Sequence, residues 1–168
     1  MSDPFAGLTR SIGVSNFNSE QLDLIIKNSS TVPAVNQVEC HPYLNQNQLL
    51  DFCRERGIVL VAYSPMGMTG PSASAVPPIR MPLIKGLAEK YGVNEGQVLL
   101  RYQIQRGIVV IPKSSTKERI ISNINIFDFK LTDEEITAIN RLEKGYRCHP
   151  HTEMGIGRHK NYPFNLPF

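Results

Sequence analysis

A basic and hydroxyl-rich segment, Lys113 to Thr116, stands between an apolar run and a helical pattern. Free backbone N–H groups and the dipole at a helix N-terminus favour an anion at such a position. Arg119 follows about one helical turn later, where its planar guanidinium suits a two-pronged contact with a phosphate. The same pattern is also typical of a plain helix cap at Ser115 beside a solvated Lys113. The segment therefore predicts either a phosphate site or an ordinary helix start.

Polar side chains also end three earlier apolar runs, each of which is typical of a strand. In parallel α/β folds the ligand site lies at the carboxyl ends of the strands. Converging amide and hydroxyl groups there favour a small polar ligand, although the loops that follow strands are polar in any protein. The ring of Tyr63 is either a stacking face for a flat heterocycle or a core tyrosine. The polar residues are Ser15 and Asn16 at the first run, Asn36, Gln37 and Glu39 at the second, and Tyr63 and Ser64 at the third.

The strands that must position these side chains alternate with helical patterns. This alternation predicts parallel strands joined by helical crossovers. Both an open doubly wound sheet and a (β/α) barrel satisfy it. The predicted strands cover residues 11–15, 34–39, 58–63 and 108–111.

Helix starts and loops are marked by local residue pairs and by proline and glycine. Capping boxes, in which an N-cap side chain pairs with a residue three positions later, predict four of the helix starts. Residues 64–82 are rich in proline and glycine and predict a long loop, and residues 146–168 predict a tail on the surface. The capping pairs are Asn18 with Gln21, Asn94 with Gln97, Ser115 with Glu118, and Thr132 with Glu135.

The composition excludes several classes of protein. The 168 residues, 41% of them hydrophobic, suffice for one domain with a core. No run approaches 18 apolar residues, so we expect no membrane span. The net charge of +3 is mild and mixed, which argues against nucleic-acid and membrane-surface partners. The first seven residues lack the apolar core of a secretory signal.

The cysteines argue against disulfides and metal. There are three, Cys40, Cys53 and Cys148, and no CxxC pair occurs. Their spacing from the histidines does not match a zinc site, so we expect no metal. Unpaired cysteines fit a reducing, cytoplasmic setting.

Four motifs follow one another along the predicted strands. Together they are similar to the signatures of the aldo-keto reductase family, and the match runs from Gly7 to Phe168. The motifs are IGVSNF at 12–17, NQVECHPY at 36–43, AYSPMG at 62–67 and IPKS at 111–114, with YPF at 162–164 resembling the end of the family's tail.

The resemblance implies a (β/α)₈ barrel that moves a hydride between NADPH and a carbonyl compound. It implies that Ser15, Asn16 and Gln37 hydrogen-bond the nicotinamide carboxamide, and that Tyr63 stacks on the nicotinamide ring. The resemblance further implies that Ser64 and Met66 line the pyrophosphate path, that Lys113, Ser114, Ser115, Thr116 and Arg119 hold the adenosine 2′-phosphate, and that Asn123 contacts the adenine. Tyr146 and Cys148 fall near positions that line the substrate pocket in relatives.

The length conflicts with a complete barrel, which needs about 250 residues. The resemblance makes the four predicted strands the last four, so that residues 8–145 form a half barrel followed by the tail 146–168 within one domain. The family's acid tyrosine and its lysine, aspartate and histidine partners belong to the first four strands, and none of those motifs occurs here. We therefore expect no catalytic residue in this chain and no carbonyl reduction by the chain alone.

Three explanations fit the missing half. The chain is a truncated piece of a full enzyme, it pairs with a second copy, or it pairs with a separate N-terminal half barrel. Independently of these explanations, three functions compete: a reductase acting on a small carbonyl compound once completed, a non-catalytic NADP-binding module, and a structural or interaction remnant without a ligand.

Overall fold

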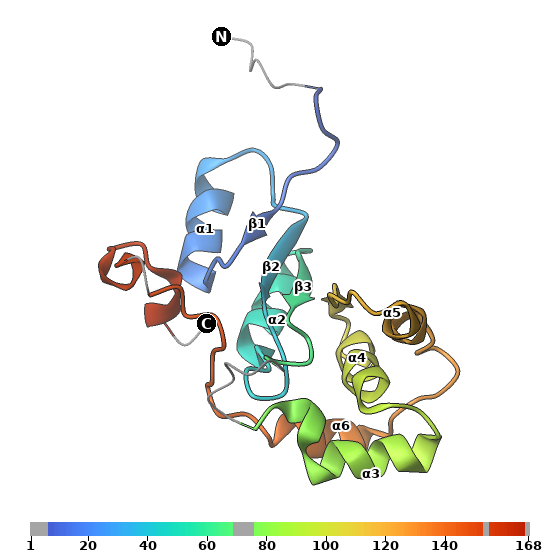
Figure 1. Ribbon diagram of the computed structural model, residues 1–168. Helices are drawn as coiled ribbons and strands as arrows, with labels where there is room; N and C mark the ends of the chain where they lie inside the picture. The colour runs from blue at the N-terminus through green and yellow to red at the C-terminus, as the bar shows by residue number, and fades with distance from the viewer. Residues whose placement is uncertain (1–6, 69–75, 153–154, 167–168) are drawn as a thin grey trace.

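The computed structural model describes residues 7–68, 76–152 and 155–166 (Figure 1). Its four strands form one parallel sheet in the order β1-β2-β3-β4, which is also their order in the sequence. Helices join each strand to the next, which confirms the predicted parallel α/β alternation. The strands are β1 (Val14–Ser15), β2 (Val35–Glu39), β3 (Val59–Tyr63) and β4 (Val109–Val110).

Six α-helices and three short 3₁₀ turns complete the described chain. One α-helix connects β1 to β2 and one connects β2 to β3, whereas two lie between β3 and β4. The α-helices are α1 (Ser19–Asn28), α2 (Asn47–Glu55), α3 (Pro82–Tyr91), α4 (Glu95–Gln105), α5 (Lys117–Ile124) and α6 (Asp133–Asn140), and the 3₁₀ turns are η1 (Pro78–Arg80), η2 (Ile156–Arg158) and η3 (Pro163–Asn165).

The two central strands carry most of the pairing. β2 and β3 pair along their whole lengths, with Glu39 opposite Tyr63 at their carboxyl ends. The outer strands are shorter than the predicted 11–15 and 108–111, because each pairs on one side only. Single hydrogen bonds continue the ladder beyond them, from Ala34 N to Ile12 O at 2.8 Å and from Ile111 N to Ala62 O at 3.2 Å.

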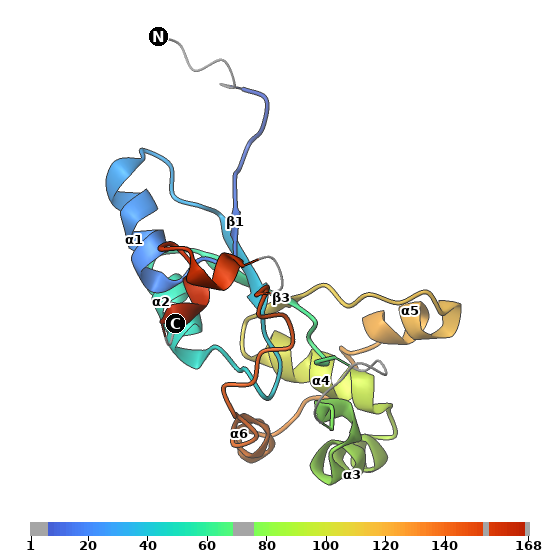
Figure 2. The same ribbon diagram turned by 60° about the vertical axis from the view of Figure 1, so that its left-hand side comes forward.

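Two apolar clusters hold the elements together. In the first, Leu22 of α1 and Cys53 of α2 pack against strand residues such as Leu60. In the second, α3, α4 and α6 pack on one another through residues that include Val98 and Ile139. Figures 1 and 2 show this helical group at the opposite end of the molecule from α1. The clusters fix the strands whose carboxyl ends carry the polar residues.

Three of the four predicted capping boxes are present, those of α1, α4 and α6. The predicted box of Ser115 with Glu118 is wrong. Thr116 is the N-cap of α5 and makes no side-chain capping bond. The helix begins one residue later than predicted, so Ser115 lies before the N-cap, where the Ser114 hydroxyl accepts from the backbone N–H of Thr116 at 3.1 Å.

The tail returns across the molecule to α1 (Figure 2). The side chain of Asn18 donates to the backbone O of Pro163 at 3.0 Å, and that of Gln21 donates to the O of Asn161 at 2.8 Å. The tail therefore contacts the N-terminus of the first helix as well as the sheet.

Apolar side chains are exposed at both outer edges of the sheet. Next to β4, one face of α5 carries Ile120, Ile121 and Ile124, which are 55%, 53% and 66% exposed. Next to β1, Ile12 is 49% exposed. No element within 7–68, 76–152 and 155–166 packs over these side chains, although the helical pattern of the isoleucines is that of a buried face.

Part of the predicted long loop 64–82 lies outside the described residues, namely 69–75, as do the first six residues and therefore most of the segment tested for a secretory signal. The loop begins with a turn in which Gly67 N donates to Ser64 O at 2.8 Å, and it ends with η1. Among the described helices, none has the length and apolar character needed to span a bilayer.

Candidate functional site

The carboxyl end of β1 is bonded directly to the neighbouring strand. Both the Ser15 hydroxyl and the Asn16 backbone N–H donate to the O of Gln37, each at 2.9 Å. Asn16 adopts a left-handed conformation with φ of 58°, which asparagine tolerates better than most residues. The structure therefore brings together the three residues that were predicted to meet a nicotinamide carboxamide.

Asn36 sets the turn that follows β1. Its buried side-chain amide donates to the O of Phe17 at 2.9 Å and accepts from the N–H of the same residue at 3.4 Å. Both polar groups of one loop residue are thus held by one side chain of β2. We call these two bonds between Asn36 and Phe17 the clamp. Asn16 immediately precedes Phe17, so its left-handed turn lies between its own bond to Gln37 and the clamp.

Tyr63 ends β3 and reaches back to β1. Its hydroxyl donates to Oδ1 of Asn16 at 3.1 Å. Burial, followed by the charge of Glu39, raises the pKa of the Tyr63 phenol, so the hydroxyl stays protonated and remains a donor. Ser15, Asn16, Gln37 and Tyr63 form one connected group at the carboxyl edge of the sheet.

A histidine of the tail lies against Tyr63. The ring centroids of Tyr63 and His149 are 5.9 Å apart at an interplanar angle of 60°. Nε2 of His149 is also 3.2 Å from Oγ of Ser64, a residue held at φ of 48°. Tail and strand thus meet at the ring that was predicted to stack on a nicotinamide.

The residues predicted to hold a phosphate follow β4 and enter the first turns of α5. Lys113, Ser115, Thr116 and Arg119 are exposed, and Ser114 is half-buried. Thr116, the N-cap of α5, makes no side-chain capping bond. Asn123 lies further along α5 and is half-buried. The assignment of these residues to a phosphate and an adenine stays a prediction.

Met66 has a different environment from the other predicted cofactor residues. It is half-buried and packs against the helical cluster, and a Cβ on Gly96 of α4 would lie 3.3 Å from its methyl group. The side chain of Met66 therefore faces α4. Among the described residues, no contact links it to the group around Tyr63.

Tyr146 and Cys148, the predicted substrate-pocket residues, line one small cavity. Tyr43, Met68, Val76, Pro77 and Pro78 complete its walls. The backbone N–H of Tyr146 donates to the O of Tyr43 at 3.0 Å, which anchors this part of the tail. The structure therefore brings the two predicted residues together beside the carboxyl end of β2.

Glu39 is the anchor of the tail, and sequence reasoning missed this role. Its carboxylate accepts from the backbone N–H of Cys148 at 2.6 Å and from that of His149 at 3.0 Å. It also lies 2.8 Å from Nε2 of His41. Burial alone raises the pKa of Glu39, but these three hydrogen bonds outweigh it and lower the pKa to about 2. The carboxylate is therefore ionised at neutral pH.

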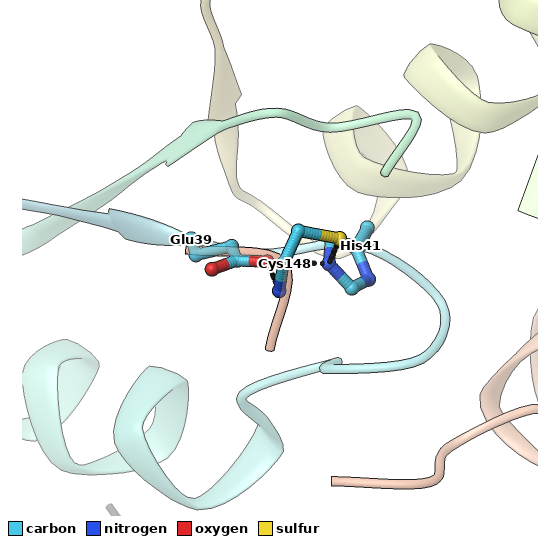
Figure 3. A group of neighbouring side chains, drawn as sticks. All are labelled: Glu39, His41 and Cys148. Atoms are coloured by element: carbon cyan, nitrogen blue, oxygen red, sulfur yellow. Dashed lines mark hydrogen bonds and ion pairs between the residues drawn. The ribbon is translucent and has the colours of Figure 1, made fainter. Parts of the chain in front are cut away.

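A signal for part of this arrangement is present in the sequence. Glu39 and His41 are two positions apart at the end of a strand, and alternate strand residues share one face. The third member, Cys148, lies 107 residues after His41, and its Sγ is 3.4 Å from Nε2 of His41 (Figure 3). The spacing of these residues in the sequence therefore could not predict that Cys148 of the tail lies beside His41.

The comparisons with known proteins agree with this geometry. The family model described as "Aldo/keto reductase family" matches residues 5–144. The chicken (Gallus gallus) protein "Aldo-keto reductase family 1 member A1" is 45% identical over 174 residues, covering 96% of this chain and 53% of that protein. The rabbit (Oryctolagus cuniculus) "Prostaglandin-E(2) 9-reductase" is 47% identical, covering 95% of this chain and 51% of that protein.

Solved structures give the same result. A Bombyx mori aldo-keto reductase in complex with NADP superposes with a TM-score of 0.86 at 43% identity, covering 94% of this chain and 52% of that one. An aldo-keto reductase complexed with NADPH gives the same TM-score at 42% identity, covering 95% and 50%. The chain spans about half the length of the relatives it matches. Its sheet is therefore part of a (β/α)₈ barrel, and the chain belongs to the aldo/keto reductase family.

Proposed function

We propose that this chain is the NADP(H)-binding half of an oxidoreductase that reduces aldehydes or ketones to alcohols. One observation carries the proposal: the connected group of Ser15, Asn16, Gln37 and Tyr63 at the carboxyl edge of the sheet. Amide and hydroxyl groups beside an aromatic ring fit a flat carboxamide-bearing ring. Similar solved aldo-keto reductases are in complex with NADP or NADPH, which supports the choice of nucleotide.

The remaining roles follow the order of the strands. Ser15, Asn16 and Gln37 hold the carboxamide, and Tyr63 stacks on the ring. Exposed cations after β4 hold the adenosine 2′-phosphate, where backbone N–H groups at the start of α5 add a favourable dipole. The proposed pyrophosphate residues are Ser64 and Met66, the proposed phosphate residues are Lys113, Ser114, Ser115, Thr116 and Arg119, and Asn123 is the proposed adenine contact.

The bound nucleotide supplies the hydride, and this chain's residues orient it. Tyr63 keeps its proton and ties Asn16 to the sheet, so the carboxamide partners are preorganised rather than mobile. Tyr146 and Cys148 line the cavity proposed for the carbonyl substrate. His149 lies against the ring of Tyr63, so this tail residue moves aside when the nicotinamide stacks there.

The chain alone is proposed not to reduce carbonyls. Reduction needs a positioned proton donor for the carbonyl oxygen. Two tyrosines near the site have engaged hydroxyls: that of Tyr63 donates to Asn16, and that of Tyr43 donates to the O of Val76 at 2.9 Å. Purified chain mixed with NADPH and a generic aldehyde is expected to show no turnover, and turnover at an ordinary reductase rate contradicts this.

The exposed edges support completion by further strands. Ile12 beside β1 and the isoleucine face of α5 beside β4 are the surfaces that neighbouring barrel elements cover in a closed barrel. The partner is either the first half of the same barrel or a second copy of the chain. Light scattering of the purified chain distinguishes the two partners. A homodimer has twice the mass of one chain, whereas a monomer indicates that the separate half is the partner. The free cysteines fit a cytoplasmic setting.

Nucleotide binding is tested without any chemistry. The full chain is titrated by calorimetry with 2′-phosphorylated ADP and, as the matched control, with ADP. Stronger binding of the 2′-phosphorylated ligand that weakens as salt is added is the expected result. Equal affinity for the two ligands, or no binding of either, contradicts the proposed NADP(H) function.

A further inference from the structure

Three metal-ligating side chains meet at the carboxyl end of β2 (Figure 3). Oε1 of Glu39, Nε2 of His41 and Sγ of Cys148 all lie within 4.8 Å of one another. The first two come from β2 and the residues just after it, and the third comes from the tail. No assigned role of the cofactor site uses His41.

One pair of the ligand atoms already has the spacing that a small cation requires, and a second pair is too close. Tetrahedral zinc, with bonds of about 2.0–2.3 Å, sets neighbouring N, O and S ligands about 3.4–3.6 Å apart. Sγ of Cys148 is 3.4 Å from Nε2 of His41. Oε1 of Glu39 is closer to Nε2, at 2.8 Å, so the carboxylate must turn away by about half an ångström to admit the ion.

Burial and charge favour one divalent cation. The side chains of Glu39 and His41 are both 0% exposed. A carboxylate and a thiolate together carry two negative charges, which a divalent ion neutralises where water cannot. Nitrogen, sulfur and oxygen in one site is a ligand set that zinc accepts.

The backbone already holds these ligands in place. Glu39 is fixed in the ladder opposite Tyr63, and His41 exchanges two backbone hydrogen bonds with Leu44, at 3.1 and 2.8 Å. Cys148 is held by its N–H bond to Glu39. Cys148 also lines a small cavity, and the proposed fourth ligand is a water molecule that enters from it.

We propose that Glu39, His41 and Cys148 bind a zinc ion that fastens the tail to the end of β2. On binding, the Cys148 thiol gives its proton to solvent, and Nε2 of His41 offers its lone pair to the metal while the ring proton resides on Nδ1. Nδ1 has no hydrogen-bond partner among the described residues. Metal binding therefore exchanges the contact of Nε2 with Glu39 for a bond to zinc and leaves the Nδ1 proton without an acceptor among the described residues.

Cobalt spectroscopy of the full chain tests the ligand set. Metal-depleted protein is titrated with Co²⁺, and then Zn²⁺ is added in competition. The expected result is one Co²⁺ per chain, with an intense d–d spectrum typical of tetrahedral geometry and a thiolate-to-cobalt absorption band, both abolished by Zn²⁺. A weak octahedral spectrum without the thiolate band overturns the proposal.

Variants identify the three ligands. Cys148→Ser is expected to remove the thiolate band while Cys40 and Cys53 remain in the chain, and His41→Gln and Glu39→Gln are each expected to weaken Zn²⁺ binding at least tenfold. The control is His159→Gln, an exposed histidine of the same tail, which leaves binding unchanged. A Cys148→Ser protein that keeps the thiolate band overturns the assignment.

A measurement on the unaltered chain covers the case in which a variant does not fold. Cys40 and Cys53 are 0% exposed and Cys148 is only half-buried, so an alkylating reagent reaches Cys148 first. Mass spectrometry follows alkylation at each cysteine with and without saturating Zn²⁺. Slowing at Cys148 by at least tenfold is expected, and an unchanged rate at that cysteine contradicts the site.

Discussion

The hydroxyl of Tyr63 donates to Oδ1 of Asn16 at 3.1 Å and so joins the ends of β3 and β1 across the intervening strand β2. Both residues belong to the group proposed to bind a nicotinamide. The bond restrains the side chain of Asn16, a residue that sits in a left-handed turn. The ring and the hydroxyl of Tyr63 therefore have separable roles.

Substitutions at Tyr63 separate these roles. Tyr63→Phe keeps the ring and removes one hydrogen bond, so we expect NADPH affinity to fall by less than about tenfold and stability by about 1 kcal/mol. Tyr63→Ala also removes the stacking face, for which an additional loss of about 1–3 kcal/mol is typical of base–aromatic contacts. Calorimetric titration measures both variants. Equal weakening by the two substitutions contradicts ring stacking.

The 2′-phosphate assignment predicts a difference between two cofactors. Arg119→Ala removes a charged donor from the start of α5, so we expect NADPH binding to weaken about tenfold or more while NADH binding changes little. Arg141→Ala is the matched control, because Arg141 is an equally exposed arginine at the end of α6. If the Arg119 variant loses the same affinity for NADPH and for NADH, the assignment of Arg119 to the 2′-phosphate is wrong.

Local interactions in the fold could be predicted from the sequence, whereas those that depend on distant partners could not. The capping boxes at Asn18, Asn94 and Thr132 join residues three positions apart, and all three are present. The predicted box at Ser115 is absent because the helix begins one residue later, with Thr116 as its N-cap. Strand length failed at the two edges of the sheet, where pairing depends on a neighbour that the local sequence does not describe.

The same division holds for the site. Ser15, Asn16, Gln37 and Tyr63 were predictable as a group because parallel strands bring their carboxyl ends to one edge. The capture of the tail by Glu39 was not, because it joins a carboxylate to backbone N–H groups 109 and 110 positions away. Every residue except proline carries a backbone N–H, so no side-chain pattern marks the two that bind Glu39.

The clamp on Phe17 predicts a marked loss of stability at a single position. Asn36→Ala leaves both the N–H and the O of Phe17 without their partner in a half-buried loop, so we expect the free energy of unfolding to fall by about 1–3 kcal/mol. Asn36→Asp keeps the acceptor and loses the donor. Because its carboxylate is buried against the O of Phe17, urea denaturation is expected to place it at or below the stability of the alanine variant.

The exposed Asn28 provides the control for this experiment. Its side chain makes one hydrogen bond, to the O of Leu24 at 2.8 Å on the surface of α1. Asn28→Ala is therefore expected to change the free energy of unfolding by less than about 0.5 kcal/mol. If the alanine variants at 36 and 28 lose the same stability, the clamp has no special role.

Stability at high pH depends on the buried thiol of Cys53. Burial raises its pKa from 9.0 to about 11, although a hydrogen bond with Asn36 and the charge of Arg56 act in the opposite direction. Between these values the folded chain binds more protons than the unfolded chain, so the free energy of unfolding falls as the pH rises. The contribution of the protonated Cys53 thiol to the free energy of unfolding is complete below pH 9 and is lost progressively above it.

Replacing the thiol isolates this effect from the other buried acids. Cys53→Ser removes the titrating group at nearly constant volume, and the buried Cys40 and Tyr102, whose pKa values burial also raises, remain in the chain. We expect a shallower decline of the unfolding free energy between pH 9 and 11 in the serine variant, measured by urea denaturation at each pH. A constant offset between the two proteins, with an unchanged slope, shows instead that Cys53 ionises as easily in the folded chain as in the unfolded one.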